Sequence, residues 1–365
     1  MRRFPLLISA LLCATPLLAQ TDQYIISRQG TVSIMPVFQR WTGRNSGLGF
    51  SEFSTILSAY VPLGRNASLN LSGGGAGTGG NVAQLSGLTD LQIGGNYYVE
   101  SINTVFSLGI NAPTGKKELT SEQFVTSILF SEPLFNMQVP VWGQGVNVNP
   151  GVAWVFPVND NVVLGLAAAY QYRGKYKPIE NSGFYAPGPQ ITASLGADYK
   201  INEISSLSAD FMFTSYGTDK FNDAQVFASG NSYWFNLQYR RYFRENELDV
   251  FAGYRSTSKG KVAGVGGLVS EAERLEPGRF EAYGQFKQIV NPRLAINYLA
   301  ELRIFEKTAE AYSGSKVAGV GAGPTITLPS GVFIPAMLKV DFGNLNAGGS
   351  IFGLDLRIGV GYGFQ

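Results

Sequence analysis

The sequence predicts an all-β chain that crosses a membrane as an antiparallel up-and-down β-barrel of about 16 strands, within a range of roughly 14 to 18. Two observations predict this fold: apolar and polar residues alternate with period two in many windows, and short polar turns alternate with long loops. Only 15% of the residues are charged, against about a quarter in typical soluble proteins. Many outward positions must therefore tolerate an apolar environment.

The alternation is clear between residues 90 and 99. Leu91 and Ile93 fall on one face, whereas Gln92 and Asn96 fall on the other. The same pattern recurs over residues 190–199, 233–240 and 352–364. Windows of this kind suit strands that cross a hydrocarbon layer, which takes roughly 9 to 11 tilted residues. A closed barrel is the expected way to cross, because lipid cannot satisfy an open sheet edge.

The connections predict the topology. Short polar turns centre on residues 64–66, 101–103, 159–160, 202–203, 245–246, 291–292 and 329–331. Longer connections lie near residues 42–50, 76–87, 113–145, 173–188, 216–230, 257–278, 306–317 and 343–349. Seven short turns and eight long loops imply sixteen strands, with short periplasmic turns and long extracellular loops. A secreted soluble β-sandwich or solenoid is the alternative, but it has no reason to alternate short turns with long loops.

The N-terminus has the layout of an export signal. A basic start at Arg2 and Arg3 is followed by an apolar stretch and then by small, turn-prone residues, with a predicted cut after Ala19. We therefore predict a signal peptide over 1–19 and a single barrel domain over 20–365. These features predict export to the bacterial outer membrane.

The composition excludes several kinds of chemistry. The chain has no histidine, and its one cysteine lies inside the predicted signal. These absences remove the common general base, thiolate nucleophiles and the usual zinc ligands, so we predict no enzyme, no cofactor and no metal site. Loss of Arg2 and Arg3 leaves 26 basic residues against 26 acidic ones, and such a neutral balance does not favour nucleic acid.

One glycine run matches a known motif. Gly75–Gly80 fits the spacing of dinucleotide-binding glycines, but no helix follows it and no βαβ unit surrounds it. We expect a flexible loop top instead.

Two short segments carry a family resemblance. Gly87-Leu88-Thr89-Asp90-Leu91 opens one predicted strand, and Pro113-Thr114-Gly115 follows the next. Together they resemble the outer-membrane transporters associated with meta-cleavage phenol degradation, which carry a similar "GLGDL" strand and a "PTG" after the following strand. The resemblance covers about 30 residues. It implies a barrel that passes small solutes, with apolar or aromatic ones as candidates, and it transfers no catalytic residue.

The loop over residues 113–145 is the longest connection and is unusually apolar for one that faces water. Long loops of this kind are often functional, and its apolar side chains need a surface to bury on. We predict that the loop enters the lumen and narrows the passage, with Phe124, Ile128, Leu129, Phe130 and Phe135 as constriction candidates. Packing on neighbouring loops, or a crossing hairpin, are the alternatives.

Charged residues of both signs fall on the predicted inner face. The candidates are Asp210, Arg240, Asp249, Arg255, Glu281, Lys287, Glu301, Arg303, Lys339, Asp341, Asp355 and Arg357. Opposite charges across neighbouring strands hold register, which is the structural interpretation. The functional interpretation is a transverse field that orients polar solutes in the lumen.

We predict a porin-like channel for passive passage of small solutes across the outer membrane, with selectivity set by loop 113–145. A non-conducting barrel with a structural, adhesive or secretion-accessory role is the alternative. The expected partners are outer-membrane lipid, a small-molecule solute and the barrel-assembly machinery, which would read the aromatic C-terminal strand; a homo-oligomer is left open. That strand departs from the usual signal because Gln365 follows Phe364.

Overall fold

The computed structural model describes residues 29–44, 47–308, 312–346 and 348–364. The predicted signal peptide, 1–19, lies outside these residues.

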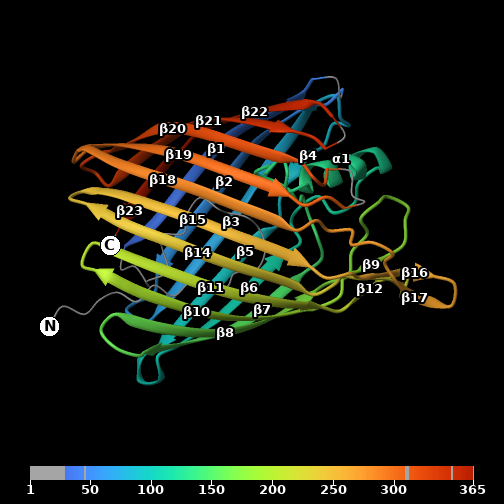
Figure 1. Cartoon of the computed structure of the whole chain (residues 1–365). Helices are drawn as coiled ribbons and strands as arrows, with labels where there is room; N and C mark the ends of the chain where they lie inside the picture. The colour runs from blue at the N-terminus through green and yellow to red at the C-terminus, as the bar shows by residue number, and fades with distance from the viewer. Residues whose placement is uncertain (1–28, 45–46, 309–311, 347, 365) are drawn as a thin grey trace.

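The described chain forms one closed antiparallel β-barrel (Figure 1). The first half of the wall comprises β1 (Gly30–Gly43), β2 (Gly49–Pro62), β3 (Ala67–Gly80), β4 (Ser86–Leu88), β5 (Leu91–Val99), β6 (Thr104–Ala112), β7 (Asn147–Pro157), β8 (Val162–Arg173) and β10 (Gln190–Asn202). The second half comprises β11 (Ser205–Tyr216), β14 (Ser232–Phe243), β15 (Asn246–Thr257), β18 (Arg279–Asn291), β19 (Leu294–Phe305), β20 (Lys316–Thr327), β21 (Val332–Asn344), β22 (Ser350–Ile358) and β23 (Val360–Phe364).

The pairing of β1 closes the barrel. β1 pairs with β2 on one side and with β22 and β23 on the other, all antiparallel. The wall contains 18 strand segments among the described residues, but β4 and β5 together line up against β3, and β22 and β23 together line up against β1. Counting each of these pairs as one wall strand gives sixteen, so the predicted fold is confirmed.

Short turns and long connections alternate as predicted, with one correction in the wall. Gly75–Gly80 was expected to be a flexible loop top, but it belongs to β3 and pairs with β2 from Gly75↔Thr55 to Gly80↔Phe50. Glycine has a low intrinsic preference for strands, so the local signal favours a loop. The backbone hydrogen bonds offered by β2 outweigh that preference.

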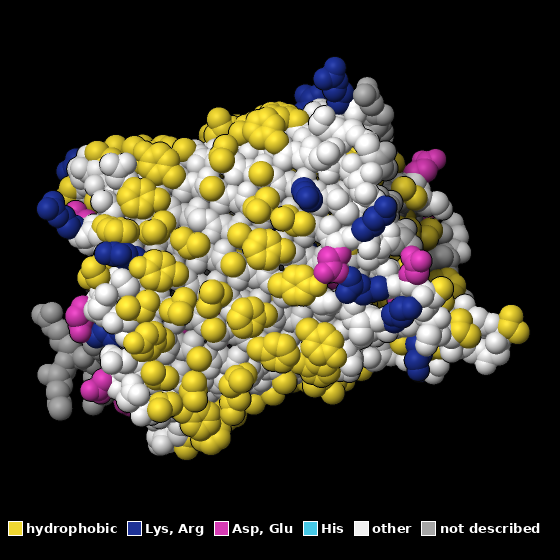
Figure 2. Space-filling model, viewed as in Figure 1, with side chains coloured by type: hydrophobic (Ala, Val, Ile, Leu, Met, Phe, Trp, Pro, Cys, Tyr) yellow, Lys and Arg dark blue, Asp and Glu magenta, His cyan; other side chains and the backbone are white. Residues whose placement is uncertain are grey.

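The outer face of the barrel is apolar. Lipid-facing side chains such as Leu195, Phe235 and Tyr298 are exposed, and Figure 2 shows hydrophobic side chains over the middle of the wall with charges gathered at its two ends. An apolar band around a closed barrel is the architecture of bacterial outer-membrane proteins. No helix among the described residues is long and apolar enough to span a membrane. Tyr60 and Tyr98, near the short turns at the ends of β2 and β5, share the inward face of their strands.

Three extracellular loops form a second sheet, which sequence patterning had indicated only as loops. It contains β9 (Tyr185–Ala186), β12 (Thr218–Phe221), β13 (Ala224–Ala228), β16 (Lys261–Gly264) and β17 (Gly267–Ser270). The Tyr185 hydroxyl donates a hydrogen bond to the Asp219 carboxylate. Burial, reinforced by this hydrogen bond, raises the pKa of Tyr185, so the hydroxyl keeps its proton and remains a donor.

Two helical segments interrupt the strands. η1 (Glu100–Ile102) makes the turn between β5 and β6, and α1 (Ser121–Ser131) lies inside the longest connection, at the mouth of the barrel (Figure 1). Thr120 caps α1: its side chain accepts from the Gln123 backbone N–H, and the Gln123 side chain accepts from the Thr120 N–H. The spacing Thr120-x-x-Gln123 before apolar residues is a capping-box signature and indicates this helix from sequence.

Candidate functional site

The longest connection, residues 113–146, turns into the barrel and packs on inward-facing side chains. Phe130 and Phe135, which are 0% and 1% exposed, surround the ring of Phe50 from β2 with centroid distances of 5.1 and 5.0 Å. Phe135 also packs edge-on against Trp41 of β1 at 5.5 Å. We call this segment the inward loop. Phe130 and Phe135 are therefore buried against the wall and shielded from solvent.

Polar side chains of the wall also bind the backbone of the inward loop. Arg303 on β19 donates to the carbonyls of Pro133 and Leu134 at 3.1 and 2.7 Å. Gln39 on β1 accepts from the Gln138 N–H at 2.6 Å and donates to the Asn136 carbonyl at 3.1 Å. These bonds satisfy loop groups that would otherwise be buried without partners.

Glu52 on β2 extends the set of tethers. Its Oε1 accepts a hydrogen bond from the Val139 N–H at 3.1 Å. Val139 belongs to a small apolar cluster with Leu85, Leu119 and Trp142. Inside the barrel the loop is therefore held by side chains of β1, β2 and β19. Outside those strands, Leu119 of the loop pairs with Ile179 in the connection between β8 and β10.

Asp90 closes the neck of the inward loop. One carboxylate oxygen accepts from the Gly115 N–H at 2.8 Å, near the start of the loop, and the other accepts from the Gln144 N–H at 2.8 Å, near its end. The second oxygen also accepts from the Asn111 side chain at 2.9 Å. A single side chain thus fixes both ends of a connection of more than 30 residues.

The neighbours of Asp90 complete the neck. The Thr114 hydroxyl accepts from the Leu91 N–H at 2.8 Å and donates to the Thr89 carbonyl at 3.2 Å. Gly115 lies so close to the Trp142 carbonyl that a Cβ would collide with it. The two short segments that carry the family resemblance therefore touch each other. The sequence alone indicates no role for Asp90, Thr114 or Gly115, although both segments stand out in it.

The five predicted constriction candidates have different surroundings. Phe130 and Phe135 are buried in the aromatic cluster, and Leu129 packs against it while partly exposed. Phe124 packs against the cluster of Leu85 and Trp142. Ile128 is 47% exposed, and Val125, one helical turn earlier, is 66% exposed.

The predicted inner-face charges form two groups, the first of which lies beside the inward loop. Arg303 and Lys339 both contact Glu301, at 3.0 and 2.9 Å, and both contact Asp341, at 3.7 and 3.2 Å. On β22, Arg357 contacts Asp355 at 2.7 Å. Asp355 and Arg303 are nearly fully buried. Arg303 is itself one of the tethers described above, and Asp355 accepts a hydrogen bond from another, Gln39, at 3.0 Å.

The second group lies on β14, β15 and β18. Arg240 contacts Asp249 at 3.2 Å and Glu247 at 3.3 Å. The remaining charged candidates are Arg255, which contacts Glu276 at 3.5 Å, Glu281, which contacts Arg279 at 2.7 Å, and Lys287, which pairs in register with Glu247.

Asp210 differs from the other inner-face charges. It faces inward on β11, opposite Gly196 of β10 and Asn236 of β14. Its carboxylate makes no ion pair or hydrogen bond to any residue that the structure describes. Asp198, on the same inner face of β10, binds the Ser208 hydroxyl but has no salt bridge among those residues. This side of the lumen therefore carries negative charge that neighbouring cations do not fully offset.

The chemistry open to the site follows from the side chains that the structure describes. No cluster of three or more His, Cys, Asp or Glu side chains able to hold a metal ion occurs within the described ranges. The site combines an apolar loop, ion pairs and uncompensated carboxylates around a polar interior. Such a surface can sort solutes by size and charge without bond-making chemistry.

Comparisons with known proteins identify no family for this chain. No protein-family model matches the chain, and no curated protein matches it significantly. Solved structures that resemble it include an outer-membrane channel from Pseudomonas putida F1 (11% identity, TM-score 0.37, covering 93% of this chain and 96% of the other). An anion-selective porin from Comamonas acidovorans (13%, 0.43, 92% and 98%) and Pseudomonas aeruginosa OpdL (10%, 0.47, 92% and 98%) also resemble it. Similarity at this level carries no inference about this chain, whose barrel follows from its own strand pairing. The resemblance to phenol-pathway transporters stays a prediction.

Proposed function

We propose that this protein is a passive channel of the outer membrane, in which small solutes pass between the inward loop and the opposite wall. The observation that carries the proposal is the attachment of the inward loop to the inner face of a few wall strands. Its tethers inside the barrel come from Gln39, Glu52 and Arg303, on β1, β2 and β19, and its neck is fixed by Asp90. The wall from β10 to β18 carries further polar and charged side chains that face inward, among them Asp198 and Asp210.

The arrangement supports a size filter. A loop that folds into a barrel of about 16 strands narrows a lumen that is otherwise wide enough for water and solutes. Ile128 and Val125 are the exposed apolar side chains of α1, and we propose that they give the passage a preference for apolar groups. Phe124, Leu129, Phe130 and Phe135 would act by holding the loop in place.

Liposome swelling with a series of sugars of increasing size tests this proposal. Wild-type barrels should admit small sugars and exclude larger ones. A variant lacking residues 122–138, which removes most of α1 together with Phe130 and Phe135, should admit larger sugars at higher rates. If the deletion variant folds and its size limit is unchanged, the loop does not set the size of the passage. A complete absence of flux in both proteins would refute the channel.

One observation favours a second candidate, a surface-binding role. The extracellular sheet leaves apolar side chains exposed at its edge hairpin, where Val265 is fully exposed and Val269 is also exposed. Exposed apolar patches of this kind mark interaction sites. Loss of binding to a cell or protein surface on removal of residues 261–270, with solute flux unchanged, would favour this candidate.

A further inference from the structure

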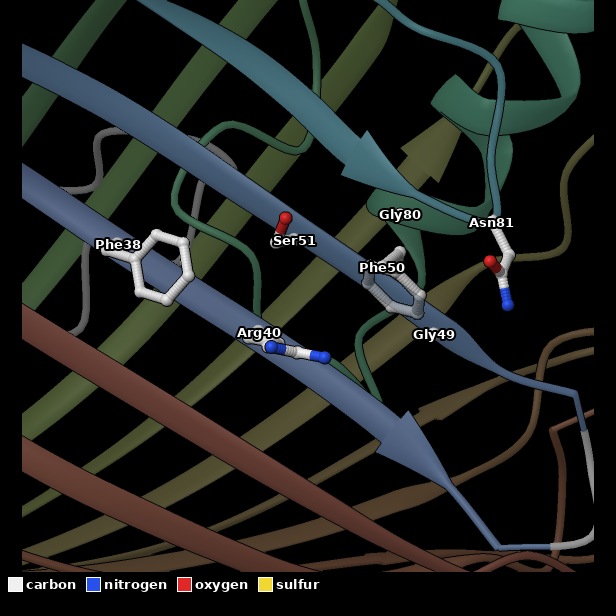
Figure 3. A pocket seen from close by; sticks show the side chains of 7 residues that line it. All are labelled: Phe38, Arg40, Gly49, Phe50, Ser51, Gly80 and Asn81. Carbon is white, nitrogen blue, oxygen red and sulfur yellow. The ribbon is translucent and has the colours of Figure 1, made fainter.

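A pocket opens on the lipid-facing wall near the extracellular rim, outside the lumen described above. It has a volume of 310 Å³, and its lining includes Phe38 and Arg40 of β1, Ser51 of β2 and Asn81 just beyond β3. Figure 3 shows the Arg40 side chain beside Ser51, with Asn81 past the end of β3. All these groups except the Phe38 ring can donate hydrogen bonds.

Arg40 faces lipid rather than the lumen. On β1 its neighbours Gln39 and Trp41 are buried against the inward loop, whereas Val32 and Ile34, on the same face as Arg40, are exposed to lipid. The Arg40 guanidinium makes no ion pair or hydrogen bond within the described residues. An arginine on the lipid face is costly unless it lies near the interface and meets an anion or water.

The register places Arg40 just below the rim. β1 ends three residues later, at Gly43, and Thr42 pairs with Phe352, whose exposed ring packs against Phe342 on the same outer face. Apolar rings therefore lie nearer the extracellular end than Arg40 does. Arg40 thus lies about 10 Å from the end of its strand, from where its long side chain can reach the boundary between acyl chains and headgroups, where lipid phosphates lie.

A glycine furrow leads from this pocket toward the middle of the membrane. Gly79, Gly77, Gly75 and Gly73 occupy four successive lipid-facing positions of β3, in register with Ser51, Phe53, Thr55 and Leu57 of β2. Exposed Phe53 and Leu57 border the furrow on one side, and exposed Leu88 of β4 borders it on the other.

The furrow has the dimensions of one acyl chain in one leaflet. Six residues of strand span roughly 20 Å, and at a tilt of about 40° they descend about 15 Å, half of a hydrocarbon core of about 30 Å. A furrow that begins at a cationic pocket and ends near mid-membrane complements a lipid that carries an anionic headgroup.

We propose that the Arg40 pocket and the glycine furrow form a binding site for an anionic phospholipid or glycolipid of the outer leaflet. Its phosphate accepts hydrogen bonds from Arg40, Ser51 and Asn81, and one of its acyl chains lies along the furrow. The proposal concerns the outer wall and is independent of whether the lumen conducts.

Native mass spectrometry of the detergent-folded barrel tests the site, with phosphatidylglycerol and phosphatidylcholine of identical acyl chains as probes. Wild-type protein should retain one phosphatidylglycerol and bind it about tenfold more tightly than phosphatidylcholine, as a charge-assisted contact predicts. Arg40→Ala should lose this preference. The matched control is Arg241→Ala, which removes a lipid-facing arginine near the periplasmic end that stacks on Phe243 at 4.8 Å, and it should bind as wild type does.

A second variant tests the furrow without changing charge. A Cβ at Gly77 would meet only the Ser86 Cβ, at 3.9 Å, so Gly77→Leu fits the wall and fills the furrow. It should weaken phosphatidylglycerol binding several-fold. Equal lipid binding by wild type, Arg40→Ala and Gly77→Leu would overturn the proposal. Displacement of the lipid by excess inorganic phosphate would also overturn it, because the site would then recognise free phosphate rather than a lipid.

Discussion

Removal of the Asp90 carboxylate should release the inward loop at its neck. Asp90→Ala deletes two hydrogen bonds to the loop backbone, at Gly115 and Gln144, both 2.8 Å long. Hydrogen bonds to a charged group contribute about 1.5–3 kcal/mol each, so the free energy that favours the docked loop over the released loop should fall by at least about 3 kcal/mol. That loss lowers the ratio of docked to released loop about 100-fold.

Liposome swelling with sugars of increasing size measures this release. Asp90→Ala should admit larger sugars than wild type does. Asp90→Asn should fall between the two, because its amide oxygen can still accept from one backbone N–H. Asp210→Ala is the matched control, since it removes an inner-face carboxylate that does not contact the loop, and its size limit should equal that of wild type. A folded Asp90→Ala barrel with an unchanged size limit and unchanged protease resistance within residues 113–146 would refute the role of the neck.

Three further predictions follow from single side chains. Phe135→Ala should destabilise the docked loop by about 3–5 kcal/mol, because the ring is buried against Trp41 and Phe50; limited proteolysis of the loop measures this, and wild-type resistance would contradict it. Asp210→Asn should lower the cation-to-anion permeability ratio by roughly twofold, seen as a shift in reversal potential under a salt gradient, because its charge has no cationic partner among the described residues. Tyr185→Phe should weaken the extracellular sheet by about 1.5–3 kcal/mol, detected as faster hydrogen exchange in β9 and β12. Folding raises the pKa of Tyr185 above its ordinary value of 10.0, so the stabilisation from this hydrogen bond should be fully present below pH 10.0 and be lost as the pH rises through the raised pKa. The prediction would be contradicted if, at a pH below 10.0, the stability difference between wild type and Tyr185→Phe already decreased.

The barrel could be predicted from sequence because its signals are local. Alternation with period two depends on which face each residue of one strand meets, and turn residues mark where each strand ends. The alternation predicted for β5 is present in the structure, where Leu91 and Tyr97 are exposed on the outer face and Gln92 and Asn96 share the inner face. The regular alternation of short turns and long loops then gave the number of strands, although no contact between strands was known.

The site could be predicted only in outline, because its parts come from distant segments. The apolar run in residues 113–145 indicated that the loop needed a surface, but not that Trp41 and Phe50 would provide it. The role of Asp90 depends on the meeting of residues 90, 115 and 144, which no local pattern encodes. Arg303 was predicted as a charge in the lumen, whereas its guanidinium lies largely buried against the loop carbonyls.

The glycine-rich half of β3 shows a different difficulty. Gly75–Gly80 has neither strand preference nor side chains whose alternation could be seen, so the sequence favours a loop there. Its strand conformation comes from the backbone partners that β2 offers. The three extracellular loops likewise pair with one another, and a pair such as Phe227↔Val262 joins segments far apart in the chain.

Single-channel conductance of the purified, folded protein in a planar lipid bilayer tests the central proposal most directly. A passive channel predicts stable openings in the absence of any partner, with a preference for cations that Asp210→Asn reduces. A folded barrel that stays silent, and stays silent after removal of residues 122–138, would contradict passive passage.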